Sequence, residues 1–162
     1  MLHAKDIMTP NPVTVRPEID ILQAARLLLE KGYNGLPVVD AQGVLKGVLC
    51  QSDLISQQKR LKLPSLFTLL DGFFPISSTD AFERELKRMT ATTVADAMSD
   101  EPVWVTPDTS IEDVATLMVD RKLHTLPVLD NGKLVGIIGK EDVLRALVAA
   151  QDQPVKPGDS TA

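Results

Sequence analysis

Few residues of this chain have types that could do chemistry, and most of them stand alone. Cys50 is the single thiol, and His3 and His124 form no metal-ligand spacing with the acidic residues. The sequence contains no P-loop, G-x-G-x-x-G, H-E-x-x-H or nucleophile-elbow motif, so we expect neither catalysis nor a metal site. Two carboxylates stand out, Asp53 and Asp142, because each follows an apolar run and opens a segment of helical character. A carboxylate in that place caps a helix or binds a ligand, and nothing in the sequence makes the two an acid–base dyad.

Asp53 and Asp142 occupy equivalent places in an internal repeat. Thirteen of the thirty-five residues at 6–40 are identical to their counterparts at 96–130. The next turn is one residue shorter in the second copy, so the offset becomes 89 and pairs Asp53 with Asp142. This repetition divides the chain into a first repeat at 1–55, an unmatched segment at 56–92, a second repeat at 93–150 and a disordered tail at 151–162.

Each repeat predicts the same element order, β-α-β-β-α. Apolar residues recur at i, i+3, i+4 and i+7 from Ile21 and from Ile111, the pattern of a helix with one buried face. Asp20 and Ser110 are in place to cap these helices, and Asn131-Gly132 is a strong hairpin signal. In the first repeat we also expect a helical turn near 4–8, a proline-bounded strand at 13–15, a hairpin over 37–49 and a closing helix from 52 onward. In the second repeat the same elements are expected near 94–98, 103–105, 127–138 and from 141 onward.

The expected fold is α/β of the α+β type, with two repeats packed by pseudo-twofold symmetry and a partly helical insertion between them. A unit of about fifty residues is too small to bury its apolar faces well, so the two repeats should share one core. Aromatic residues make up only 4% of the chain, so that core must consist of Val, Leu, Ile and Ala. The symmetry also implies a pair of clefts between the repeats.

Composition narrows the class of protein. Hydrophobic residues make up 44% and charged residues 24%, values typical of soluble globular proteins. No stretch approaches the ~20 apolar residues of a membrane helix, and the first residues do not resemble a signal peptide. A single cysteine excludes an intramolecular disulfide framework, so we expect a cytoplasmic protein. The net charge of −5 argues against a nucleic-acid partner.

The two copies resemble a tandem pair of CBS domains, known as a Bateman module. The family pattern joins an h-Pro-Val-h-Asp strand to a G-h-h-[T/S]-x-x-D segment, where h is apolar. The strand is present at 36–40 and 126–130, and the segment follows at 47–53 and 136–142, apart from its hydroxyl residue. The resemblance implies a stand-alone regulatory protein that binds AMP, ADP, ATP or S-adenosylmethionine in the clefts. It also implies a homodimer and control of a partner protein in trans.

The same resemblance indicates which residues would hold the ligand. Asp53 and Asp142 match the position whose carboxylate accepts hydrogen bonds from the ribose diol, although capping alone would also explain both. The family hydroxyl three residues earlier is replaced by Cys50 and Gly139, which removes a hydrogen bond worth about 0.5–1.5 kcal/mol. A ligand-free structural or dimerisation module is therefore the alternative function. Ser52 and Lys140 are in place to supply the missing hydrogen-bonding group. The alternative is that both are solvated residues at a helix start.

In relatives that bind nucleotides, the two residues before the h-Pro pair face the phosphates. Those residues are Asn34-Gly35 in the first copy and His124-Thr125 in the second, and Tyr33 would border an adenine ring. Without a ligand, His124 would be an exposed residue at a strand entry. The second copy offers more charged groups, so we expect it to prefer a phosphorylated ligand through His124, Thr125, Lys140 and Asp142.

The unmatched segment 56–92 is unusually apolar for a linker. It contains all four phenylalanines of the chain, and flexible linkers are polar. Three roles fit this composition: cover for the apolar faces of the repeats, a homodimer surface, or contact with a partner or membrane surface. The phenylalanines are Phe67, Phe73, Phe74 and Phe82.

Overall fold

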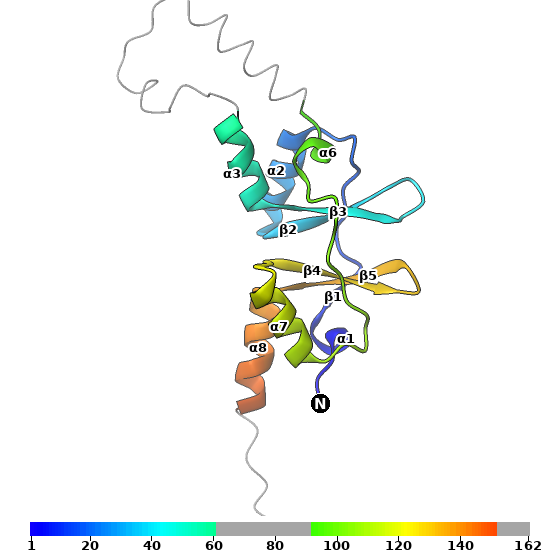
Figure 1. The fold of residues 1–162 in the computed structure, drawn as a ribbon, viewed down its shortest axis with the longest axis vertical. Coiled ribbons are helices and arrows are strands. Elements are labelled where there is room, and N and C mark those ends of the chain that lie inside the picture. The colour runs from blue at the N-terminus through cyan, green and yellow to red at the C-terminus, as the bar shows by residue number, and fades with distance from the viewer. Residues whose placement is uncertain (61–91, 152–162) are drawn as a thin grey trace, which may run out of the picture.

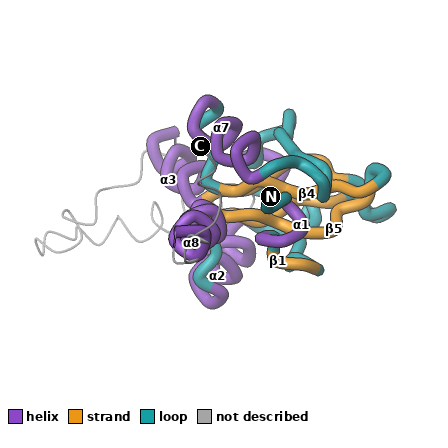
Figure 2. Tube along the Cα trace, turned by 90° about the horizontal axis from the view of Figure 1, so that it is seen from below, coloured by secondary structure: helices purple, strands orange, loops and turns teal. Residues whose placement is uncertain are grey.

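The computed structural model describes residues 1–60 and 92–151 and consists of two similar halves stacked end to end (Figure 1). The first half contains helices α2 (Ile21–Lys31) and α3 (Gln51–Arg60), and the second contains α7 (Ile111–Asp120) and α8 (Lys140–Gln151). All four helices lie along one side of the molecule, and the hairpins project from the other side (Figure 2). The expectations for residues 61–91 and 152–162 lie outside the described residues.

Each half contains one antiparallel hairpin. In the first half β2 (Gly35–Val39) pairs with β3 (Leu45–Cys50), and in the second β4 (Thr125–Asp130) pairs with β5 (Lys133–Gly139). In the second hairpin, Asn131 and Gly132 both have positive φ, at 48° and 78°, as the predicted two-residue turn requires. These small antiparallel sheets with helices on one side confirm the predicted fold class.

The expected strands at 13–15 and 103–105 are reduced to single parallel bridges. Val15 donates its N–H to Pro37 O at 3.1 Å and accepts from Val39 N at 3.0 Å, and there the ladder stops. In a parallel ladder the next bonds on either side would need N–H groups from Pro37 and Pro17, and proline has none. Pro107 and Pro127 impose the same limit on the second copy, so the prolines that bound each predicted strand also shorten it.

Helix ends follow the sequence signals closely. The Asp20 carboxylate accepts a hydrogen bond from Leu22 N at 2.6 Å, and the Ser110 hydroxyl accepts one from Asp113 N at 3.1 Å. Helix α2 ends at Gly32, whose φ of 66° is left-handed, as expected of a glycine cap. At the equivalent place after α7, Lys122 adopts φ 54°, a conformation that non-glycine residues seldom adopt.

The two halves exchange their first segments. Helix α1 (Ala4–Ile7) and strand β1 (Thr9–Pro10) precede the first repeat in sequence, yet β1 pairs with β5 and Ala4 lies in the core of the second half. In the same way α6 (Val94–Ala97) packs into the core of the first half, around Val94. Each segment then crosses back between the halves, so the chain passes through the boundary twice (Figure 1).

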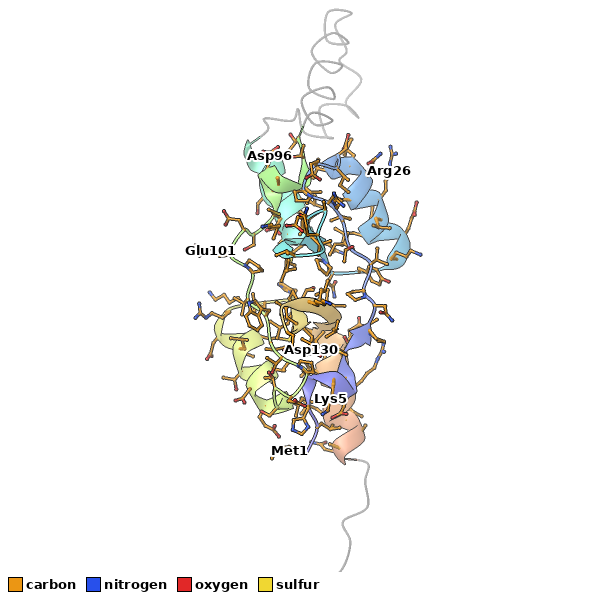
Figure 3. All side chains as sticks on the ribbon, turned by 90° about the vertical axis from the view of Figure 1, so that its right-hand side faces the viewer. Met1, Lys5, Arg26, Asp96, Glu101 and Asp130 are labelled. Atoms are coloured by element: carbon orange, nitrogen blue, oxygen red, sulfur yellow. The ribbon has the colours of Figure 1, made fainter. Side chains whose placement is uncertain are left out.

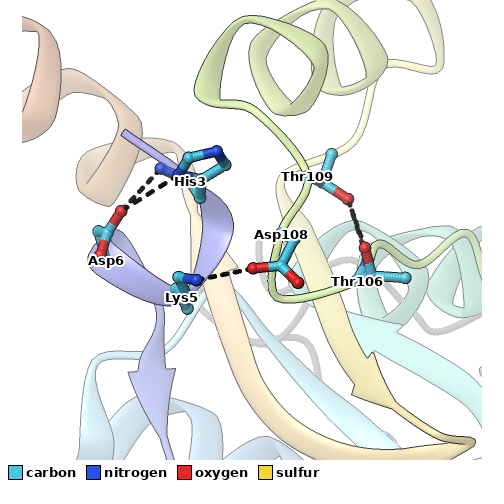
Figure 4. A network of polar contacts seen from close by, with 6 residues as sticks. All are labelled: His3, Lys5, Asp6, Thr106, Asp108 and Thr109. Carbon is cyan, nitrogen blue, oxygen red and sulfur yellow. Dashed lines mark hydrogen bonds and ion pairs between the residues drawn. The ribbon is translucent and has the colours of Figure 1, made fainter. Parts of the chain in front are cut away.

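A polar network fastens α1 to the half that it joins (Figure 4). Lys5 Nζ donates to Asp108 Oδ1 at 2.7 Å, and this contact raises the pKa of Lys5 and lowers that of Asp108. Backbone bonds from Ala4 N to Thr109 O and from Lys5 N to Pro107 O bind the same loop. The first segment is therefore held to the second half by backbone hydrogen bonds as well as by packing.

The core of the described residues is aliphatic, as the composition predicted. The single core expected for the two repeats is wrong, because a separate cluster of buried side chains fills each half. Neither cluster contains an aromatic residue among its buried members. Trp104 is 49% exposed, and Tyr33 only borders the cluster of the first half. Leucines, isoleucine and valines are the largest fully buried side chains besides proline: Leu28, Leu36, Leu49, Leu126, Ile138, Val38, Val94, Val114 and Val128.

Candidate functional site

Two clefts lie at the boundary between the halves, and each is assembled from three segments. The first, which we call the Asp53 cleft, is lined from the segments 48–53, 99–103 and 122–125. Glu101, on its rim, lies at the level where the halves meet (Figure 3). The second, which we call the Tyr33 cleft, is lined from 9–13, 32–35 and 137–141, together with Thr125. The empty space in them, with the solvent at their open mouths included, is about 640 and 630 Å³.

The clefts combine residues across the repeats, so the grouping expected from sequence is wrong. We expected His124 and Thr125 to act with Asp142 of their own copy, but they line the cleft that contains Asp53 and Ser52. Both clefts lie between the halves. The start of α3 therefore faces residues 122–125 of the second half, and the start of α8 faces residues 32–35 of the first. Conversely, the candidate residues Tyr33, Asn34 and Gly35 of the first copy line the Tyr33 cleft beside Gly139 and Glu141 of the second.

Lys140 lies in neither cleft. Its side chain borders an apolar groove between α7 and α8, which Lys122 and His124 also line. Lys140 and His124 thus lie together as expected, but Lys140 lines neither cleft, so its role as a substitute phosphate-binding group in a cleft has no geometric support. Ser52, whose counterpart in the second copy is Glu141, does line the Asp53 cleft.

Asp53 both caps a helix and faces a cleft. Its Oδ2 accepts a hydrogen bond from Cys50 N at 2.7 Å, and the side chain lines the Asp53 cleft. Within the described part of the chain, Oδ1 has no hydrogen-bond partner. Burial raises the pKa of Asp53 above its usual value of 3.8, against the opposing effect of the Cys50 hydrogen bond. One carboxylate oxygen is thus fixed by the backbone, which leaves the other to receive a donor from a ligand.

Asp142 repeats this geometry in the second copy. Its Oδ2 accepts from Gly139 N at 2.8 Å, so the same two-residue loop is closed at the start of α8. Gly139 and Glu141 line the Tyr33 cleft, whereas Asp142 itself is not part of that lining. The capping role expected of both aspartates is confirmed, whereas ribose binding by them remains a prediction.

Cys50 lines the Asp53 cleft, half-buried, at the position of the missing family hydroxyl. Burial, reinforced by the neighbouring charge of Asp53, raises its pKa to about 11. A thiol with that pKa carries almost no thiolate at neutral pH, and the thiolate is the reactive form. The thiol lines a cleft as expected, and its raised pKa favours the expected inert form.

Gly35 and Thr125 face each other where the two halves meet. They are equivalent positions in the repeat, and a Cβ placed on Gly35 would lie 2.7 Å from Thr125 Oγ1 and 3.3 Å from Cys50 Sγ. Thr125 is the one buried polar side chain among the described core residues, and it lines both clefts. Sequence reasoning named both residues as phosphate-facing but could not foresee their contact, since that depends on how the halves pack.

Two sequence-related halves around paired clefts, each cleft with a carboxylate at a helix start, define a duplicated ligand-binding module. The chain belongs to the CBS domain family, whose model matches residues 4–60 and 94–149. The resemblance seen in the sequence is thereby confirmed as a tandem CBS pair.

Several known proteins similar to this chain are named as CBS domain proteins. It is 32% identical over 154 residues to the uncharacterized protein MJ1426 of Methanocaldococcus jannaschii, covering 89% of this chain and 90% of the relative. It is 36% identical over 148 residues to the chloroplastic CBSX2 of Arabidopsis thaliana, covering 87% and 61%. The crystal structure of CBSX2 in complex with AMP superposes with a TM-score of 0.70 at 29% identity, covering 93% of this chain and 99% of that one. The CBS pair of MJ0100, solved with 5-methylthioadenosine and S-adenosyl-L-methionine, shares the fold at TM-score 0.70 and 23% identity, covering 93% and 98%.

The described residues form neither a metal-binding cluster nor a membrane-spanning helix. Residues 1–60 and 92–151 contain no group of three or more His, Cys, Asp or Glu side chains that would hold a metal ion. No helix in those ranges has the length and apolar character needed to cross a bilayer.

Proposed function

We propose that this chain is a regulatory module that binds an adenosine-containing ligand in its clefts. The observation that carries the proposal is Asp53, which is half-buried at a cleft of about 640 Å³ with one carboxylate oxygen fixed by Cys50 N and the other without a partner. A ribose diol offers two O–H donors, and hydrogen bonds to a carboxylate are worth roughly 1.5–3 kcal/mol each. The AMP complex of the similar CBSX2 supports the same ligand class.

The rest of each cleft suits the remaining parts of such a ligand. Val103 and Leu123 give the Asp53 cleft an apolar wall, and Val13 and Tyr33 do the same for the other cleft. Apolar and aromatic walls favour a planar base, and a few polar groups fix its orientation. The ligand would contact both halves at once, because each cleft combines segments of both. Binding would therefore favour one packing of the halves and pass that preference to a partner protein.

Isothermal titration calorimetry with AMP, ADP, ATP, S-adenosylmethionine and adenosine tests this proposal. We expect at least one of these ligands to bind below millimolar concentration and to raise the melting temperature in the same order as its affinity. Guanosine monophosphate, which has the same ribose and phosphate, is the matched control for the base. If none of the adenosine ligands binds at millimolar concentration, the ligand-free structural module becomes the better function.

The role that we propose is regulatory, with no reaction catalysed by the module itself. A cytoplasmic location remains our expectation from the sequence, although two of the similar proteins carry chloroplastic names. The partner protein is unidentified. It would be recognised as a protein whose binding to this chain changes when the ligand is added.

We also propose that the helix side of the molecule forms a homodimer. Of ten exposed large hydrophobic residues in the described chain, six lie on the four helices of that side. Val119 of α7 and Leu144 of α8 border an apolar groove between their helices. A patch of this kind on one face is typical of a protein interface. The six residues are Leu29, Ile55, Val119, Leu144, Leu147 and Val148.

The double variant Leu144→Glu/Val148→Glu is expected to be monomeric. The two positions are four residues apart on α8, hence on one face, and both side chains are at least 60% exposed, so the fold should survive the change. Light scattering would report the mass, and circular dichroism the fold. Val44→Glu, in the hairpin turn on the opposite side, is the matched control and should stay dimeric. A folded double variant with the mass of a dimer would refute this interface.

A further inference from the structure

The two clefts differ in charge although the repeats that form them are equivalent. The Asp53 cleft contains Lys122 and His124 opposite its two acidic residues, Asp53 and Glu101. The lining of the Tyr33 cleft contains one charged side chain, Glu141, and no cation. The carboxylate of Asp142 caps Gly139 N beside that cleft but is not part of its lining. The Asp53 cleft therefore offers a phosphate the Lys122 cation and the His124 ring N–H, whereas the lining of the Tyr33 cleft offers no cationic side chain.

Lys122 is the residue that makes this difference. Lys122 lies just after α7 and has φ 54°, whereas the equivalent residue of the first copy is Gly32, with φ 66°. A left-handed conformation is unfavourable for a side chain with a Cβ, and glycine adopts it freely. The second copy thus holds a lysine where glycine would be more stable, and that lysine lines the cleft. Strained residues of this kind concentrate at functional sites.

Helix dipoles do not account for the difference. Helices α3 and α8 begin at the Asp53 and Tyr33 clefts in the same way, and in each the carboxylate of the third residue caps the residue before the helix. Both helix starts attract an anion to a similar degree. Glu141 also lies 3.5 Å from Arg145, but that pair is exposed and offsets little of its charge. The side chains that line the clefts, rather than the helix starts, therefore set the selectivity.

We propose that the two clefts take ligands of different charge: a phosphorylated adenosine nucleotide in the Asp53 cleft and an uncharged adenosine nucleoside in the Tyr33 cleft. This inference rests on the proposed function, because it assumes that both clefts accept adenosine. Lys122 and His124 would donate to the phosphate in the first cleft. In the second, Glu141 would repel a phosphate while the apolar wall and Asp142 would still accept the base and ribose.

Calorimetric stoichiometry tests the proposal on the full chain. We expect adenosine to fill two sites per chain and AMP to fill one, with adenosine still binding once to the AMP-saturated protein. Raising the salt concentration should weaken the binding of AMP but leave the binding of adenosine nearly unchanged, since salt screens charge interactions. Two equivalent AMP sites would overturn the assignment while leaving the proposed function intact. No binding of either ligand would refute both.

Two substitutions locate the sites. Lys122→Gly should lower AMP affinity about tenfold, the effect of losing roughly 1.4 kcal/mol, and should raise the melting temperature by about 2–4 °C because glycine relieves the left-handed strain. Arg121→Gln, which removes an equal charge just outside the cleft, is the matched control and should change neither. Glu141→Lys should create a second AMP site. An unchanged AMP affinity in Lys122→Gly, or a single AMP site in Glu141→Lys, would overturn the proposal.

Discussion

The variant Asp53→Asn is expected to bind AMP about ten- to a hundredfold more weakly, because it replaces charge-assisted hydrogen bonds to the ribose with weaker neutral ones. Asparagine keeps an oxygen that can accept from Cys50 N, so the cap of α3 should remain. The ligand-free variant should therefore melt no lower than the parent chain. Calorimetry and thermal unfolding, each with and without AMP, measure the two effects separately.

Asp113→Asn is the matched control for this experiment. Asp113 is the third residue of α7, as Asp53 is of α3, yet it lines neither cleft. Its substitution removes one negative charge from an equivalent helix position and should leave AMP affinity unchanged. Equal losses in both variants would show that overall charge, and not a ribose contact, controls binding.

The raised pKa of Asp53 gives this prediction a pH dependence. Burial places the folded-state pKa above the ordinary 3.8, so the charged form is less stable in the fold than in the unfolded chain. That destabilisation is present at neutral pH and disappears as the pH falls through the folded-state pKa. Adenosine affinity should fall over the same pH range, because the protonated carboxyl is a weaker acceptor, and Asp53→Asn should show neither effect.

Gly35→Ala is expected to destabilise the fold by about 1–3 kcal/mol, as overpacking of a dense interior does. The added methyl would lie 2.7 Å from Thr125 Oγ1, and Thr125 is 6% exposed, so its side chain has little room to move. In a Thr125→Ala background the nearest clash is absent. The same glycine substitution should then be less harmful by at least 0.5 kcal/mol, a typical coupling between residues in contact.

Urea unfolding of the two single variants and the double variant gives that coupling directly. The matched control pairs Gly35→Ala with Val128→Ala, a core substitution in the second half at a residue outside the Gly35 contact. Those two changes should be additive. Additivity of Gly35→Ala with Thr125→Ala would mean that the two halves do not meet at this pair.

Sequence patterns predicted most of the elements local to one repeat, although the strands expected at 13–15 and 103–105 are only single bridges. The apolar spacing from Ile21, the Ser110 cap and the Asn131-Gly132 turn each depend on residues within one turn or hairpin, and the structure confirms all three. The exchange of α1 and α6 could not be predicted in this way. Apolar spacing shows that Ala4 and Val94 face a core, but not which of two similar cores receives them.

The same limit explains the mistaken grouping of site residues. His124 and Asp142 are near in sequence and belong to one repeat, whereas His124 and Asp53 meet only because the halves pack across a pseudo-twofold axis. Repeat equivalence identified the right residues but not their partners. The position of Lys140 outside the clefts has a similar cause, since a shift of one residue along a helix start rotates the side chain by about 100°.

Because α1 packs into the second half and α6 into the first, the two halves exchange segments as the subunits of a domain-swapped dimer do, but within a single chain. A break in the backbone anywhere between residues 60 and 92 would leave two fragments, each of which still completes the core of the other. Those fragments would remain associated, whereas either one alone would expose apolar core surface. The exchanged segments α1 and α6 thus supply contacts between the halves that do not depend on the covalent connection.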